Sequence, residues 1–130
     1  MNTKLLMTIS ALIMGMTGVA LSFLPQEVSG SLGMPEAAAI ILQVLGALYL
    51  GFAMINWTAK ANLIGGIYSR PVALGNLAHF VIGALALAKL AFKDAGPTYL
   101  WVVALVYSVF AILFAYVFFT TPALKSSKYN

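Results

Sequence analysis

Long apolar runs separated by short polar segments are the first pattern in this chain of 130 residues. Four runs carry almost no charge and have about 20 residues each, the length of a helix that crosses a bilayer. We predict helices over residues 5–24, 37–57, 72–90 and 98–121. Because the connections are short, neighbouring helices should be antiparallel. The predicted fold class is all-α, an integral membrane antiparallel bundle of four transmembrane helices in a single domain over residues 1–130.

The first run has two interpretations. Gly18 and Ala20 are small residues at the spacing of a signal-peptide cleavage site. The apolar run is longer than the core of a typical signal peptide, so we favour a membrane span. Small residues also recur along one side of this helix, which predicts a seam where another helix packs closely. The seam residues are Thr8, Ala11, Gly15, Gly18 and Ser22.

Proline marks the segments between the runs. Pro25 should break the first helix, and residues 25–33 should form one amphipathic turn on the membrane surface. Pro35 and Pro71 suit the first turns of the second and third helices, where the hydrogen-bond donor that proline lacks is not needed. Pro122 should end the fourth helix.

Polar side chains gather on one face of the second and third predicted helices. The face of the second helix contains Gln43, Gly46, Tyr49, Leu50, Ala53, Asn56 and Trp57. The stripe on the third contains Asn76, His79, Gly83 and Ala86. An unsatisfied polar group is costly in lipid, so both faces should point into the bundle and form a polar cluster in its inner half. The candidate ligand-binding residues of this cluster are Tyr49, Asn56, Trp57, Asn76 and His79.

Two stripes lie along the fourth predicted helix. The small-residue stripe, which should pack inward, contains Ala104, Ser108, Ala111 and Ala115. The aromatic stripe, which should face lipid, a partner subunit or an apolar ligand, contains Val103, Tyr107, Phe110, Phe114 and Phe118.

Composition and charge support a membrane protein. The chain is 62% hydrophobic and 8% charged, whereas soluble domains carry about 25% charged residues. Its net charge is +4, but the cations are spread singly or in pairs without a basic stripe, so no nucleic-acid partner is predicted. The side with both termini and the loop containing Lys60 and Arg70 has cations and no acids. The positive-inside rule therefore places both termini in the cytoplasm.

Reactive groups are scarce in the predicted spans. His79 is the candidate for titration near neutral pH. We expect it to join neighbouring helices, with ligand contact as the alternative and proton transfer as the third. A single histidine without cysteine or carboxylate neighbours does not supply a metal-ligand set. The sequence therefore predicts no catalytic residue, no metal and no cofactor, and its lack of cysteine excludes disulfides.

The loop between the second and third helices is basic. Lys60 and Arg70 are candidate lipid-headgroup residues, and the backbone of Gly65 and Gly66 would help to hold a phosphate. The favoured alternative is an ordinary cytoplasmic loop, because glycines are common in turns.

Several glycine and apolar patterns suggest a family. They are Pro25 after the first helix, the Leu32–Gly33 pair, the run from Leu45 to Phe52 and the turn from Asp94 to Pro97. In these features the chain resembles small four-helix bacterial membrane proteins of the DoxX-like kind. The resemblance implies an integral protein of a bacterial inner membrane with a poorly defined role, and it carries over no catalytic residue.

The function predicted from these patterns is that of a non-enzymatic multi-pass membrane protein, acting as an accessory or interaction subunit. Its expected partners are membrane lipids and either a second copy or another membrane protein. The alternative is a binder or carrier of a small apolar or lipid-like molecule, using the polar cluster. A second alternative is a lipid-modifying membrane enzyme with His79 as its acid–base group.

Overall fold

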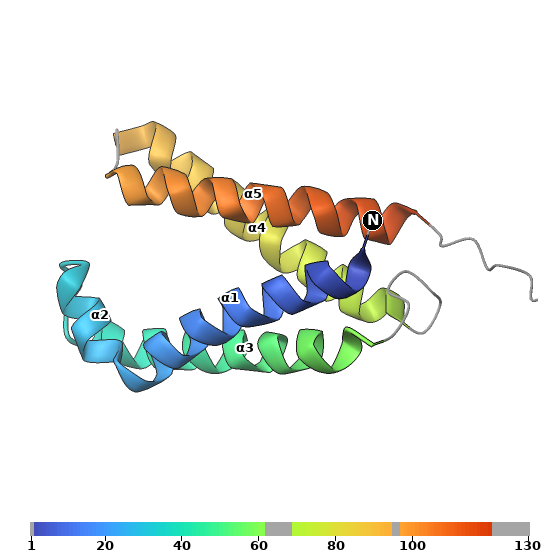
Figure 1. The fold of residues 1–130 in the computed structure, drawn as a ribbon. Coiled ribbons are helices and arrows are strands. Elements are labelled where there is room, and N and C mark those ends of the chain that lie inside the picture. The colour runs from blue at the N-terminus through green and yellow to red at the C-terminus, as the bar shows by residue number, and fades with distance from the viewer. Residues whose placement is uncertain (1, 62–68, 95–96, 121–130) are drawn as a thin grey trace, which may run out of the picture. The chain divides into compact units, whose positions relative to one another are not determined.

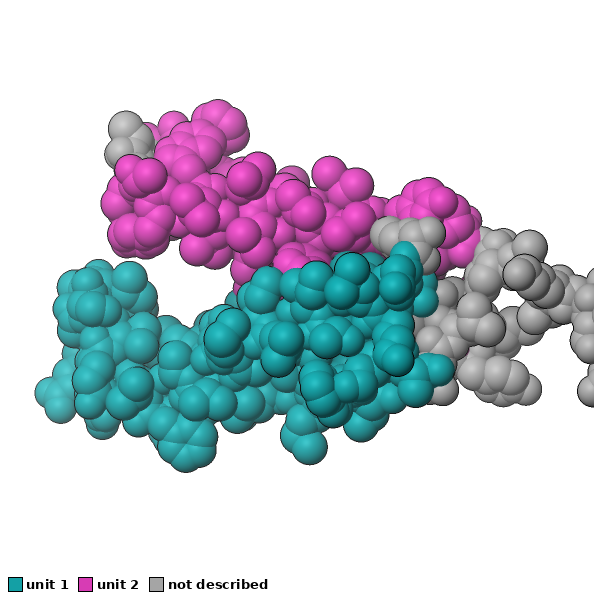
Figure 2. All heavy atoms as spheres, in the orientation of Figure 1, with its two compact units in different colours: residues 1–61 teal, residues 62–130 magenta. Residues whose placement is uncertain are grey.

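The computed structural model describes residues 2–61, 69–94 and 97–120. These residues form five helices and no strand, and four of the helices are long and apolar enough to cross a membrane. The prediction of an all-α chain with four long apolar helices is therefore confirmed, and such helices indicate a membrane protein. The chain divides into two compact units, residues 1–61 and 62–130 (Figure 2). The single transmembrane domain remains a prediction.

Unit 1 consists of α1 (Thr3–Phe23), α2 (Pro25–Ser31) and α3 (Ala38–Ala59), with α1 and α3 side by side (Figure 1). Pro25 ends α1 because its nitrogen carries no hydrogen for the helix ladder. Gly33 adopts a φ of 64°, which a residue without Cβ tolerates. The Ser29 hydroxyl donates to the Pro35 carbonyl over 3.1 Å. These features turn the chain from α1 back into an antiparallel α3, through a short helix rather than the predicted single turn.

The backbones of α1 and α3 meet at two glycines. A Cβ added to Gly46 would stand 2.7 Å from the backbone nitrogen of Ser22. A Cβ added to Gly18 would stand 2.8 Å from the backbone nitrogen of Leu50. Gly18 and Ala11 are both buried. The predicted small-residue seam of the first helix is confirmed, because only small residues let two helix backbones approach so closely.

Unit 2 pairs α4 (Arg70–Asp94) with an antiparallel α5 (Thr98–Phe119). The predicted third helix ended at residue 90, whereas α4 continues for another turn. Lys93 in that turn does not prevent this extension, because a long cationic side chain can reach away from an apolar surface. Pro97 is the residue that precedes α5.

Aromatic rings fill the space between α4 and α5. Phe80 is 1% exposed and stacks on Phe110 and Phe114, with ring centroids 4.9 and 5.6 Å away. The prediction that the aromatic stripe of the fourth helix faces lipid, a partner or a ligand is therefore wrong for these two rings. They lie one turn apart on α5 and both contact Phe80. Ala104 and Ala111 are buried too, as predicted for the small-residue stripe.

Candidate functional site

Asn56 is a fully buried amide that joins α3 to α1. Its side-chain nitrogen donates to Ser10 Oγ over 3.1 Å and to Met14 Sδ over 3.7 Å. The Ser10 hydroxyl donates in turn to the Met7 carbonyl over 3.1 Å. This predicted ligand-binding residue therefore contributes to helix packing, as polar pairs between helices commonly do in membranes.

Trp57 lies next to Asn56 in sequence but on an exposed side of α3. Its side chain is 48% exposed, and Lys60 Nζ lies 2.8 Å from its ring centroid in a cation–π contact. Trp57 also borders a shallow hollow of about 270 Å³ between α1 and α3. Tyr49 is half-buried on the same helix. Within unit 1, Asn56 is buried against α1 and Trp57 is exposed, and the prediction that the whole polar face of the second helix points into a four-helix bundle remains a prediction.

Asn76 and His79 lie one turn apart on α4. Asn76 is fully buried, and its side-chain nitrogen donates to the Val72 carbonyl over 2.9 Å. The His79 ring packs against Phe80 at 5.0 Å and Tyr107 at 5.6 Å between centroids. The His79 ring therefore adjoins the aromatic core of unit 2, whereas the Asn76 amide bonds within α4.

The five candidate ligand-binding residues are divided between the units. Tyr49, Asn56 and Trp57 belong to unit 1, and Asn76 and His79 belong to unit 2. The cluster proposed between the second and third long helices would span both units and remains a prediction.

The candidate headgroup residues are also divided between the units. Lys60 follows α3 and contacts Trp57, whereas Arg70 is the exposed first residue of α4. Gly65 and Gly66 lie outside the described residues. The predicted phosphate site therefore remains a prediction. The Lys60 ammonium group lies over the Trp57 ring.

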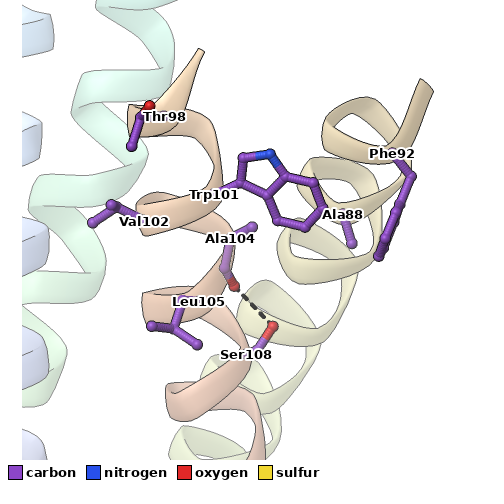
Figure 3. A pocket seen from close by; sticks show the side chains of 8 residues that line it. All are labelled: Ala88, Phe92, Thr98, Trp101, Val102, Ala104, Leu105 and Ser108. Carbon is purple, nitrogen blue, oxygen red and sulfur yellow. Dashed lines mark hydrogen bonds between the residues drawn. The ribbon is translucent and has the colours of Figure 1, made fainter. Parts of the chain in front are cut away.

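A hollow of about 460 Å³ lies on unit 2 near the junction of α4 with α5 (Figure 3). Its wall is almost entirely apolar, and the rings of Phe92 and Trp101 meet edge to face at 5.0 Å. The lining residues are Ala88 and Phe92 from α4, and Thr98, Trp101, Val102, Ala104, Leu105 and Ser108 from α5. This size falls within the range of small-molecule sites, about 300–1,000 Å³.

The sequence interpretation did not predict this hollow. It sought a site among polar residues near the start of the third helix, whereas Phe92 and Trp101 stand at the opposite end of α4 and at the start of α5. The available signal was a pair of large aromatic residues on either side of a short turn. Such a turn brings the two helix ends together.

Metal-binding side chains do not gather in the described part of the chain. Across residues 2–61, 69–94 and 97–120, His, Asp and Glu form no group of three that could surround one ion.

No protein-family model, curated protein or solved structure matches this chain.

Proposed function

We propose that this chain is a non-enzymatic, multi-pass membrane protein that acts by associating with a second copy of itself or with another membrane protein. The observation that carries the proposal is an open pair of small residues on α3. Gly51 and Ala47 lie four residues apart, and both are exposed. Apart from its chain neighbours and the adjoining backbone of α3, no described atom lies within 4 Å of the position that a Cβ on Gly51 would take. Small residues at this spacing allow a second helix to approach closely in lipid.

The contrast with Gly46 makes this pair informative. Gly46 is already occupied, since Ser22 of α1 lies against it, whereas Gly51 on the outward side is open. Large apolar side chains surround the open pair and suit a lipid-facing helix surface. The exposed large hydrophobic residues along α3 are Ile40, Ile41, Val44, Leu45, Leu48, Met54, Ile55 and Trp57.

The hydrogen bonds of several polar groups in the spans also support an interaction role. The side chains of Thr17, Asn76 and Ser108 donate to carbonyls four residues earlier in their own helices. Asn56 donates to Ser10 of the neighbouring helix. These hydrogen bonds engage the polar groups within one helix or, for Asn56, between α3 and α1, and association through apolar faces requires no reactive side chain.

The test is native mass spectrometry of the full chain extracted gently from its own membrane, comparing wild type with Gly51→Leu. We expect wild type to carry a second copy or a partner, and Gly51→Leu to reduce that species at least severalfold. Ala86→Leu on α4 is the matched control, because Ala86 is also a small exposed helix residue. A wild-type protein that is strictly monomeric and without a co-purifying protein would overturn the proposal.

We further propose that the protein is of the DoxX-like kind and resides in a bacterial cell membrane with both termini in the cytoplasm. The proposal is supported by four helices capable of spanning a membrane and by the loop cations Lys60 and Arg70. Because the chain has no cysteine, single cysteines introduced at Asn2 and at Asn130 would report each terminus by labelling from one side. Labelling from outside intact cells would contradict this orientation.

A second candidate function is the binding or carriage of a lipid-like molecule. The hollow on unit 2 is the observation that favours it, since its wall is apolar with a few polar groups. This site differs in position from the polar cluster that the sequence suggested.

A further inference from the structure

The hollow between α1 and α3 ends beside a cation. Trp57 forms part of its wall in the last turn of α3, and Lys60 Nζ lies 2.8 Å from the centroid of that ring. The cation therefore contacts a side chain that lines the hollow. The rest of the wall is mostly apolar, and its lining residues are Ala11 from α1 and Leu50, Ala53, Met54, Trp57 and Thr58 from α3.

A second cation stands at the same end of unit 1. Lys4 and Ala11 are seven residues apart, which is two helical turns, so they share the side of α1 that borders the hollow. The hydrogen bond between Asn56 and Ser10 fixes the register of the two antiparallel helices. At 1.5 Å per residue, Lys4 precedes Ser10 by about 9 Å. Lys60 follows Asn56 by about 6 Å in the same direction. Both lysines therefore lie beyond this hydrogen bond, where α1 begins and α3 ends (Figure 1).

The charges of unit 1 are separated along its length. Among the described residues 2–61, the acids are Glu27 and Glu36, and both lie beside the turn through α2 at the other end. The end that carries Lys4 and Lys60 therefore has two cations and no acid within the described residues. An anionic group is the complement of such an end, and an apolar hollow that opens beside it suits a hydrocarbon chain.

We propose that this end of unit 1 binds one anionic phospholipid, with its phosphate beside Lys60 and Lys4 and an acyl chain in the hollow between α1 and α3. The Trp57 ring positions the Lys60 ammonium group at the edge of the hollow, and the three donors of an ammonium group leave it able to bond a phosphate. Tryptophan is also frequent at the level of lipid headgroups. The site differs from the predicted loop site, which paired Lys60 with Arg70. It is also separate from the hollow on unit 2, and it does not use the open small-residue pair at Gly51.

Trp57 provides a direct reporter of the acyl chain. The chain has two tryptophans, so a Trp101→Phe background leaves Trp57 as the sole indole. The full chain is reconstituted in phosphatidylcholine bilayers, and a small fraction of phosphatidylglycerol with brominated acyl chains is added. Bromine quenches an indole that it touches, and brominated phosphatidylcholine with the same chains is the zwitterionic comparison. The ratio of the two half-maximal mole fractions measures headgroup preference and is independent of the brightness of Trp57.

We expect the anionic lipid to be preferred, by about fivefold for each lysine at low salt. Lys4→Gln and Lys60→Gln should each lower the preference about fivefold, and the double variant should abolish it. Lys89→Gln/Lys93→Gln is the matched control, because it lowers the net charge equally but changes lysines of α4 in unit 2. That control should retain the preference.

The acyl chain is tested by filling the hollow from either wall. Ala11→Val and Ala53→Val add carbon to α1 and α3 without changing charge, and each should reduce quenching by the anionic lipid. Helicity measured on the same samples shows that each variant is folded, and two variants on opposite walls allow one to replace the other.

Four results would overturn this lipid site. Equal quenching by both lipids in the Trp101→Phe background would deny headgroup selection, and so would a preference that survives Lys4→Gln/Lys60→Gln. Quenching that neither valine variant reduces would place the acyl chain outside the hollow. A Trp57 shielded from both lipids would mean that a protein segment covers it. Native mass spectrometry of the same samples reports association separately, so either proposal can fail while the other stands.

Discussion

The two units hold their long helices together by different means. In unit 1, the backbones of α1 and α3 touch at Gly18 and Gly46, and a buried amide joins them farther along. In unit 2, α4 and α5 are joined by stacked rings around Phe80. In unit 2, Gly83 makes room for the Tyr107 ring, because a Cβ on Gly83 would stand 2.5 Å from two carbons of that ring.

This difference shows what replaces the hydrophobic effect between helices in lipid. Lipid tails are as apolar as leucine, so burying an apolar side chain against another helix contributes little by itself. The closeness of van der Waals packing between the helices then decides their stability. Unit 1 achieves close packing with glycines that let two backbones touch, and unit 2 achieves it with large aromatic rings that stack on one another. A larger side chain at the glycine seam cannot be accommodated by a small adjustment, because the neighbouring atoms include backbone atoms. An aromatic ring, by contrast, can rotate or shift.

Gly46→Leu should have the largest effect. Its side chain would collide with the Ser22 backbone and with Leu21, which cannot move without separating α1 from α3. We expect a loss of about 3 kcal/mol or more, at the upper end of overpacking costs. Helicity followed during titration with a denaturing detergent measures it. Gly51→Leu is the matched control on the same helix and should change stability little, and similar losses in both variants would contradict the backbone seam.

Phe80→Ala should come second. It removes the ring on which Phe110 and Phe114 stack and leaves a cavity, but the lost transfer energy is small when the alternative environment is lipid. We expect a loss of about 2 kcal/mol, below the about 3–5 kcal/mol found in water-soluble cores. The same detergent titration applies, with Phe119→Ala as control because Phe119 is 77% exposed. Equal losses in the two variants would argue against the aromatic stack.

The hydrogen bond between Asn56 and Ser10 should have the smallest effect. A double-mutant cycle with Asn56→Ala and Ser10→Ala should give a coupling of about 0.6 kcal/mol, the average for such pairs in a membrane protein. The control is a second cycle that combines Asn56→Ala with Thr17→Val. The Thr17 hydroxyl donates to the Ile13 carbonyl of its own helix. That control should be additive. A coupling energy near zero in the Asn56–Ser10 cycle would mean that this hydrogen bond does not stabilise the packing of α1 against α3.

Sequence alone predicted the features that depend on one helix at a time. A run of about 20 apolar residues is a membrane-spanning helix almost regardless of its neighbours. Small residues at Gly18 and Ala11 share a side of α1 by helical geometry, so their burial was predictable too. The extension of α4 past residue 90 was missed because the lysines at its end were interpreted as an end signal.

Features that depend on which faces meet were not predictable. Asn56 and Trp57 are adjacent, so a broad polar face included both, yet α1 packs on one and leaves the other exposed. The rings of Phe110 and Phe114 are apolar enough to face lipid, and only their match with Phe80 turns them inward. The hollow beside Phe92 and Trp101 arises where two helices meet, which no single-helix pattern records.

The turn through α2 also bears on the order in which unit 1 closes. Gln43 donates to the Ser22 carbonyl across 21 residues of sequence, whereas Asn56 reaches Ser10 across 46. Closing a short loop costs less entropy than closing a long one, so contacts beside α2 should form first and those at the open ends last. All of these contacts lie within residues 1–61, which leave the ribosome before unit 2. Unit 1 can therefore form its helix contacts one after another, from the α2 end toward the open ends of α1 and α3, while unit 2 is still being synthesised.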